Sequence, residues 1–203
     1  LKGISKEFPW PGSRCGWIEV YNKNKDEIFA KYIKSIIDAK MMEVCSTTLP
    51  QTVIPAIMSD PRYESHLEER RSFYKKRAEK AYKILKNVPG IISPKTAGAF
   101  YVSVVFKNGV LSPPAGRAGN RQKLEIKNAK VKKFVEEKTS NGMAPDKRFV
   151  YYLMGATGIC VVPLTGFNCN LLGFRATLLE TDESKFEWIY SAIAEKIKEY
   201  LKN

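Results

Sequence analysis

The chain has 203 residues, with 34 Lys and Arg against 21 Asp and Glu, for a formal net charge of +13. Hydrophobic residues make up 44% of it, which excludes a disordered chain and predicts a packed core. No apolar run approaches the roughly 20 residues that a membrane span needs, and no signal-peptide pattern follows the first lysines, so we expect a cytoplasmic protein without a membrane partner.

The first half of the chain is predicted to be mainly helical. A loop rich in Gly, Pro and Trp opens it, and apolar residues three and four positions apart then indicate amphipathic helices. Pro89-Gly90 ends the longest of them. In order, the predicted elements are a strand over 16–20, a helix over 26–45, a break at 46–51, a short helix over 53–58 and a long helix over 62–87.

The second half alternates single strands with helices. β-branched and aromatic residues indicate the strands, and a stretch rich in Gly and Pro indicates a loop or mobile insert. The last helix has acidic residues at its positive N-terminal end. In order, the predicted elements are a strand over 100–106, the insert over 108–120, helices over 128–139 and 149–154, strands over 158–163 and 174–179, and a helix over 184–201.

The excess of basic residues would by itself suggest a nucleic-acid partner. However, the lysines of the helical stretches are interleaved with glutamates, which is typical of solvated helix faces, so we expect no nucleic-acid binding. The four cysteines and the single histidine, His66, are too widely spaced for a zinc site, and no metal is expected. We predict free thiols at all four cysteines and a surface position for His66.

The most informative segment is 5–17, S-K-E-F-P-W-P-G-S-R-C-G-W. It resembles the S-K-x5-G-x-R-x-G-W signature of class I/II aminotransferases, which are fold-type I enzymes dependent on pyridoxal 5'-phosphate. The resemblance implies that Lys6 is the catalytic residue and attaches to the cofactor aldehyde, and that Arg14 and Ser5 bind the cofactor. Gly12 is expected to let the chain turn, so that the Arg14 guanidinium grips the cofactor phosphate at the same site.

A second segment, 173–179 (G-F-R-A-T-L-L), follows Gly166-Phe167 and resembles the segment where this family holds its substrate arginine. The resemblance implies that Arg175 binds the α-carboxylate of the substrate through a planar, bidentate contact. The alternative is a structural arginine on an exposed strand edge. The segment 94–101 resembles the start of the family's small-domain sheet, in which Phe100 is either a core residue or a wall of the substrate pocket.

The resemblance extends over essentially the whole chain and implies the C-terminal half of such an enzyme. The predicted fold class is α/β: an α+β small domain over 75–203, and a remnant of the large cofactor-binding domain over 1–74, together the C-terminal part of the fold-type I transferase fold. The first sixty or so residues offer one strand and no sheet, which also indicates truncation. Gly3 departs from the family pattern, because a hydroxyl residue commonly stands three positions before the lysine.

The predicted function of the intact protein is transfer of an amino group between an α-amino acid and a 2-oxo acid by a homodimer. The resemblance implies that an upstream half supplies the aromatic ring stacked on the cofactor and the aspartate paired with its pyridine nitrogen. We therefore expect the chain to be inactive alone. The alternatives are a lyase with the same cofactor and fold, and a non-catalytic basic binding module. The side-chain preference for the substrate stays open.

Overall fold

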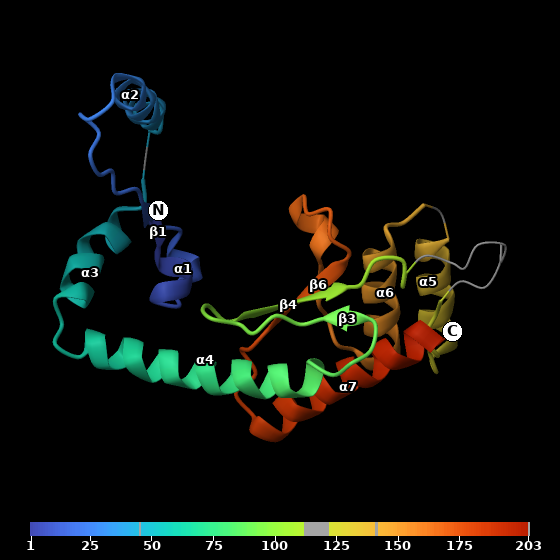
Figure 1. Ribbon diagram of the computed structural model, residues 1–203. Coiled ribbons are helices and arrows are strands. Elements are labelled where there is room, and N and C mark those ends of the chain that lie inside the picture. The colour runs from blue at the N-terminus through green and yellow to red at the C-terminus, as the bar shows by residue number, and fades with distance from the viewer. Residues whose placement is uncertain (45, 112–121, 141, 203) are drawn as a thin grey trace. The chain divides into compact units, whose positions relative to one another are not determined.

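The computed structural model describes residues 1–44, 46–111, 122–140 and 142–202. The chain divides into two compact units, Leu1–Leu67 and Glu68–Asn203 (Figure 1). The division falls within helix α4 (Tyr63–Leu85), the helix in which the sequence also predicts a boundary, after residue 74. The assignment of the first unit to a large cofactor-binding domain stays a prediction.

The first unit contains a two-stranded antiparallel sheet, with Lys2 opposite Trp17 and Gly3 opposite Gly16. The expectation that this part of the chain has no sheet was therefore wrong. Two-residue strands contain too few residues for an alternating hydrophobic pattern, so the sequence did not reveal the pairing. The elements before α4 are β1 (Lys2–Gly3), α1 (Ile4–Glu7), the 3-10 helix η1 (Pro11–Ser13), β2 (Gly16–Trp17), α2 (Glu27–Met41) and α3 (Thr48–Met58).

The two longer helices of this unit begin at recognisable residues. Asp26 caps α2, because its carboxylate accepts a hydrogen bond from the backbone N–H of Phe29 at 2.6 Å, and the predicted helix is confirmed. Helix α3 begins at Thr48, so the predicted break at 46–51 is confined to residues 46 and 47, and the predicted helix over 53–58 starts earlier. Its Pro50 lies in the first helical turn, where a backbone N–H has no partner within the helix, and proline is tolerated there.

The second unit is built on a four-stranded antiparallel sheet in the order β3-β4-β6-β5. Two predicted strands are shorter than expected, because the buried Val161 and Leu178 extend the apolar runs beyond the paired residues. The strand over 100–106 is confirmed as β4. The strands are β3 (Ile91–Ile92), β4 (Tyr101–Phe106), β5 (Val162–Pro163) and β6 (Gly173–Thr177).

The helices of the second unit confirm the predicted helices over 62–87, 128–139 and 184–201. Asn128 caps α5 and Asp182 caps α7, each accepting hydrogen bonds from backbone N–H groups of the first turn. Helix α6 begins with Pro145 at its first position, earlier than the predicted residue 149. These elements are α4, α5 (Ala129–Thr139), α6 (Pro145–Thr157), the 3-10 helix η2 (Leu164–Phe167) and α7 (Glu183–Lys202).

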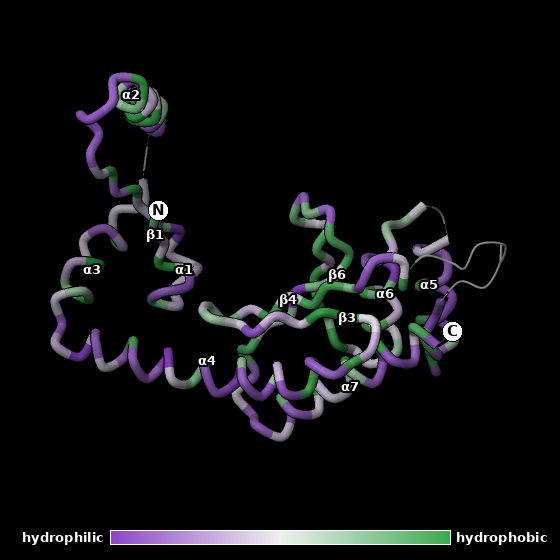
Figure 2. The backbone as a smooth tube through the Cα atoms, viewed as in Figure 1, coloured by the Kyte–Doolittle hydropathy of each residue, from purple (hydrophilic) through white to green (hydrophobic). Residues whose placement is uncertain are grey.

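The core of the second unit lies on one face of this sheet. Successive side chains of a strand point to opposite faces, and in β4 the residues Val102, Val104 and Phe106 are buried while their neighbours are half-buried. Figure 2 shows β4 as mostly hydrophobic and α4 as mostly hydrophilic. Each fully buried apolar side chain stabilises the fold by about 1.5–3 kcal/mol. The half-buried face carries Ser103 and, directly opposite it in β6, Arg175.

Gly173 is required where β6 passes β4. A Cβ at this position would lie 2.2 Å from the backbone oxygen of Val104 and 2.8 Å from the Leu164 side chain. We expect Gly173→Ala to lower the free energy of unfolding by about 1–3 kcal/mol, because the strands must separate to admit the methyl group. Gly98→Ala is the matched control, since a Cβ there meets nothing within 4 Å. Urea unfolding of the two variants checks this; equal stability would contradict the close approach.

Several predictions concern single positions or surfaces. Cys15, Cys160 and Cys169 are free thiols, as predicted, and His66 is exposed on α4. Residues 108–111 of the predicted insert form a turn, whereas the rest of it, and Cys45, lie outside the described residues.

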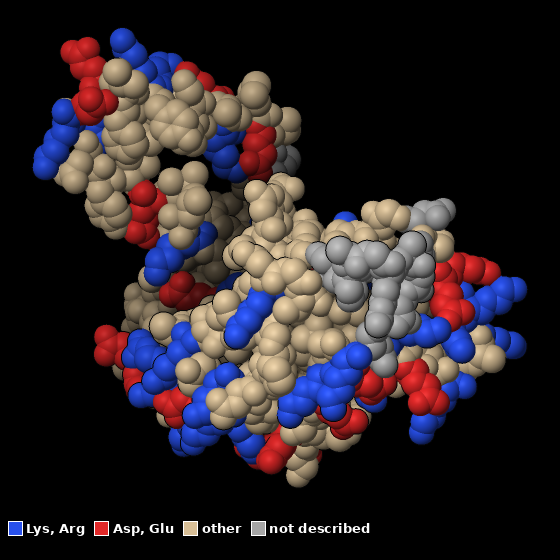
Figure 3. All heavy atoms as spheres, turned by 45° about the vertical axis from the view of Figure 1, so that its right-hand side comes forward, with Lys and Arg blue, Asp and Glu red and all other residues tan. Residues whose placement is uncertain are grey.

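On the face seen in Figure 3, basic and acidic side chains are interspersed. Within the described parts of the chain, no helix is both long enough and apolar enough to span a membrane.

Candidate functional site

The pairing of β1 with β2 closes the loop that carries Lys6 and Arg14. The backbone N–H of Ile4 donates to the carbonyl oxygen of Cys15 at 3.3 Å, and the Ile4 side chain is fully buried. A Cβ on Gly16 would lie 2.8 Å from a backbone oxygen of β1, so this close approach requires glycine. Gly16, the second glycine of the sequence signature, therefore allows the two strands to approach and close the loop.

Lys6 and Ser5 are neighbours on α1, where Lys6 is exposed and Ser5 is half-buried. The hydroxyl of Tyr63 donates to the Glu7 carboxylate at 2.7 Å, and the Phe8 ring lies 5.5 Å from the Tyr63 ring. Burial, followed by the hydrogen bond to Glu7, raises the pKa of Tyr63 to about 12. Tyr63 thus keeps its proton at neutral pH and anchors the short helix that carries the candidate lysine.

Arg14 itself makes the turn that was expected at Gly12. The backbone of Arg14 is left-handed, with φ 53° and ψ 47°, whereas Gly12 lies within η1 without a positive φ. A non-glycine residue pays about 1–2 kcal/mol for this conformation. Part of this is offset by the Arg14 guanidinium, which donates to the carbonyl oxygen of Pro11 at 2.9 Å. Within the described residues this is the guanidinium's one hydrogen bond, so its other N–H groups face solvent or a ligand.

A cavity of about 770 Å³ lies in the first unit beside β2, α2 and α3. Arg14 lines this cavity, but Lys6 and Ser5 do not. The structure thus places the three predicted cofactor residues in one closed loop without bringing them all to one cavity. Their chemistry fits pyridoxal 5'-phosphate, because a primary amine bonds to an aldehyde, and a guanidinium and a hydroxyl donate to phosphate oxygens.

Arg175 lies at the centre of β6, between Ser103 of β4 and Val162 of β5. Its guanidinium carbon lies 4.2 Å from the ring centre of Tyr101 and 4.2 Å from that of Phe167. Among the described residues, no carboxylate lies within ion-pair distance of this guanidinium. Aromatic rings hold a cation without occupying its N–H donors, which are therefore left for a ligand with planar acceptor oxygens.

The sequence did not identify the two aromatic residues that contact Arg175. Phe100, the residue singled out from this segment, is buried in the core, with its ring 5.6 Å from that of Tyr74. The next residue, Tyr101, packs its ring 4.6 Å from that of Phe100 and is the one that contacts Arg175. The sequence does not show which strand pairs with β4, and so does not show which of the two rings meets the arginine.

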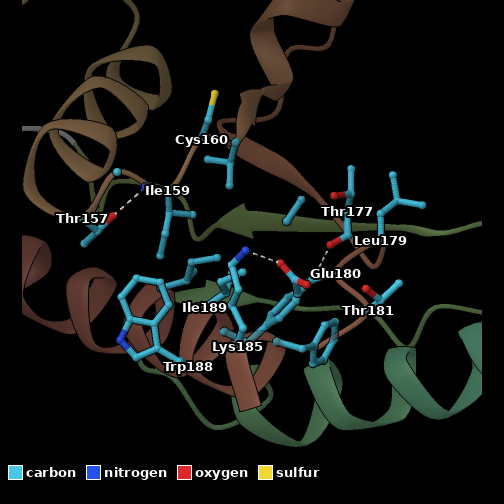
Figure 4. A pocket seen from close by; sticks show the side chains of 16 residues that line it. Thr157, Ile159, Cys160, Thr177, Leu179, Glu180, Thr181, Lys185, Trp188 and Ile189 are labelled. Atoms are coloured by element: carbon cyan, nitrogen blue, oxygen red, sulfur yellow. Dashed lines mark hydrogen bonds and ion pairs between the residues drawn. The ribbon is translucent and has the colours of Figure 1, made fainter. Parts of the chain in front are cut away.

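A separate cavity of about 510 Å³ lies in the second unit, between the end of α6, β6 and the start of α7 (Figure 4). Lys185 is the only Lys or Arg among its described lining residues, and it is paired with Glu180 at 2.8 Å. The hydrogen bond between them lowers the pKa of Glu180 and raises the pKa of Lys185. Arg175 does not line this cavity. The Lys185 ammonium is neutralised by Glu180, so the described lining residues offer no unpaired cation to a substrate carboxylate.

The family that unites these features is that of the class I and II aminotransferases. The family model matches residues 1–191, and the chain belongs to this family. An uncharacterized aminotransferase of Methanocaldococcus jannaschii is 56% identical over 202 residues, which is 100% of this chain and 45% of that protein. An alanine aminotransferase 2-like protein of Danio rerio is 29% identical over 185 residues, which is 86% of this chain and 29% of that protein.

A solved structure confirms the fold class. The alanine aminotransferase of Pyrococcus furiosus superposes with a TM-score of 0.59 and 22% sequence identity, covering 98% of this chain and 41% of that one. The fold is therefore the α/β fold of part of a fold-type I transferase, as the sequence predicts. The chain spans less than half the length of each of these relatives.

Proposed function

We propose that this chain is the C-terminal part of a pyridoxal-phosphate-dependent aminotransferase that moves an amino group between an α-amino acid and a 2-oxo acid. The observation that carries the proposal is the Arg175 guanidinium, held between two aromatic rings without a carboxylate partner among the described residues. Family membership supports the reaction type. We further propose that the intact enzyme is a homodimer, as the family resemblance implies, and that it is cytoplasmic.

The loop of the first unit is proposed to hold the cofactor. The Lys6 amine would hold the cofactor by condensing with its aldehyde, with loss of water, and would move a proton to and from the α-carbon of the substrate. The Arg14 guanidinium and the Ser5 hydroxyl donate to the phosphate oxygens. Gly3 provides no hydroxyl, so one phosphate contact is either missing or supplied by Ser5 or the backbone. When bound, pyridoxal 5'-phosphate supplies an electron-accepting ring that stabilises negative charge at the α-carbon.

Arg175 is proposed to orient the substrate. Its guanidinium binds the α-carboxylate through two parallel hydrogen bonds, which fix the direction in which the α-hydrogen points. Both the amino acid and the 2-oxo acid carry this carboxylate next to the reacting carbon, so one arginine serves both halves of the reaction. The names of the relatives make alanine the first amino acid to assay, and we pair it with 2-oxoglutarate as the acceptor.

Lys6 is predicted to be the residue that carries the cofactor. Borohydride reduction of the full-length enzyme with its cofactor, followed by peptide mapping, should place the pyridoxyl group on Lys6, because its amine lies in the loop that also carries Arg14. Lys2 is the matched control: it is exposed, lies on β1 of the same small sheet, and should stay unlabelled. A pyridoxyl group found mainly on another lysine would remove Lys6 from this role.

Product analysis separates the aminotransferase from a lyase with the same cofactor. A transaminase yields one new amino acid for each 2-oxo acid consumed, whereas a lyase cleaves a carbon–sulfur or carbon–carbon bond of one substrate. Both reactions use Lys6 and Arg175, so variants of these residues do not distinguish them. Stoichiometric transfer of labelled nitrogen from alanine to 2-oxoglutarate is the expected result; cleavage products without nitrogen transfer would favour the lyase.

A further inference from the structure

We propose that Asp146 is a positioning residue for the substrate-carboxylate site, acting through Thr165 and η2 on the ring of Phe167. Asp146 does not touch Arg175 in this arrangement; it fixes the short helix that presents Phe167 to the guanidinium. The inference rests on the proposed role of Arg175 as the carboxylate anchor, and it adds residues that family membership does not assign.

Asp146 is a fully buried carboxylate near the start of α6, with 0% of its surface exposed. It accepts three hydrogen bonds, from the Lys147 backbone N–H at 2.8 Å, the Thr165 backbone N–H at 3.0 Å and the Thr165 hydroxyl at 2.8 Å. Among the described residues, no Lys or Arg lies within ion-pair distance of it. A buried carboxylate without such a cation depends on these hydrogen bonds, and two of the three come from Thr165.

Thr165 is the second residue of η2, a single 3-10 helix that ends at Phe167. Asp146 holds the backbone and the side chain of Thr165 together, so it fixes the orientation of this turn relative to α6. Leu164 anchors the start of η2 in the core, whereas Phe167 at its end is 45% exposed. Because so much of the Phe167 ring faces solvent, its position depends on the path of the η2 backbone more than on core packing.

The ring of Phe167 is one of two that contact the Arg175 guanidinium, each at 4.2 Å. The Tyr101 ring comes from β4, the strand paired with β6, and is therefore fixed by the ladder of the sheet. Phe167 lies in η2 and not in a strand, so no strand pairing fixes its backbone. The hydrogen bonds between Asp146 and Thr165 fix it instead. With both rings in position, the arginine has lost part of its rotamer freedom before the substrate binds, and a preorganised receptor binds more tightly.

Asp146→Asn tests the inference in the full-length enzyme. The asparagine amide places an N–H donor against either the Thr165 or the Lys147 backbone N–H, so at least one of the three hydrogen bonds is lost. We expect KM for the amino acid and for the 2-oxo acid to rise about 3- to 10-fold with little change in kcat, because uniform substrate binding weakens. Thr165→Ser is the matched control, since it keeps both donors, and its KM should stay near the wild-type value.

A double-mutant cycle with Phe167→Ala separates positioning from mere structural support. If Asp146 acts through the Phe167 ring, Asp146→Asn raises KM in the wild-type background but adds little in the Phe167→Ala background. An equal rise in both backgrounds, or a fall in Tm with KM unchanged, overturns the proposal. If Asp146→Asn does not fold, Thr165→Val removes the hydroxyl donor alone and enters the same cycle.

The same measurements distinguish this inference from the proposed function. Arg175→Lys should raise KM whether or not Asp146 acts through Phe167. If Arg175→Lys changes KM and the cycle shows no coupling, the positioning role is wrong while the carboxylate anchor stands. If Arg175→Lys leaves KM unchanged for all substrates, Arg175 is not the anchor and both proposals are wrong. The absorbance of the bound cofactor should be unchanged in every variant, because none of these residues belongs to the loop over 3–16.

Discussion

Arg175→Lys in the full-length enzyme should lower kcat/KM by about 30- to 1,000-fold, equivalent to about 2–4 kcal/mol of transition-state stabilisation. Lysine keeps the positive charge but replaces a planar fork of N–H donors by a compact ammonium. The ammonium also loses the broad contact with the rings of Tyr101 and Phe167 that holds the guanidinium. The substrate carboxylate is then bound by a mobile point charge, and the α-hydrogen is less well oriented.

The control for this variant is Arg71→Lys on α4. Arg71 is 68% exposed and pairs with Glu68, one turn earlier on the helix surface, so its replacement should leave all kinetic constants near the wild-type values. The two variants are compared by steady-state kinetics with several amino acids and by titration with the cofactor. Cofactor affinity should be the same in both variants. Wild-type kinetics for Arg175→Lys with every amino acid would exclude this arginine as the carboxylate anchor.

The sequence predicted the helices of this chain better than its short strands. Helix α7 has apolar residues at helical spacing and an acidic cap at Asp182, and both features are local. β1 and β3 have two residues each, and what makes them strands is a partner far away in the sequence. The apolar runs around β5 and β6 show the converse error, because apolar residues such as Val161 and Leu178 are buried outside the strands themselves.

The residues of the candidate site also differ in whether local sequence or contacts across the fold reveal them. Lys6, Arg14 and Arg175 can be proposed from the sequence because chemistry constrains their residue type and their spacing in a family signature, and their roles stay predictions. Phe167 and Asp146 cannot be, because their contribution depends on contacts across the fold: Asp146 meets Thr165 nineteen residues later along the chain. Gly12 illustrates a third case. The backbone freedom of glycine predicts the turn at Gly12, whereas the left-handed residue is Arg14 itself.

The largest expected effect is the absence of transaminase turnover in a polypeptide of these 203 residues alone. The second unit should still fold, because its sheet and helices bury a continuous core that includes Phe149, Phe174 and Tyr190. In the first unit, α2 exposes the apolar Ile28, Tyr32 and other residues while burying only Ile33, and we expect this face to bind a second copy of the chain or to be poorly ordered. Circular dichroism with urea unfolding should therefore show a folded second unit.

Turnover is a stricter test than cofactor attachment, because exposed lysines also react with pyridoxal 5'-phosphate. The family resemblance implies that an upstream half supplies the ring stack and the acid that pairs with the pyridine nitrogen, and the chain spans 45% of its Methanocaldococcus jannaschii relative. Without that acid the cofactor ring would be a poorer electron acceptor, so the proposed removal of the α-proton by Lys6 would be slow. The assay uses the purified polypeptide, excess cofactor, and a panel of amino acids with 2-oxoglutarate or pyruvate. The control is the full-length enzyme under the same conditions. We expect rates equal to those of the free cofactor; sustained transamination would show that the upstream half is dispensable and that Lys6, Arg14 and Arg175 suffice.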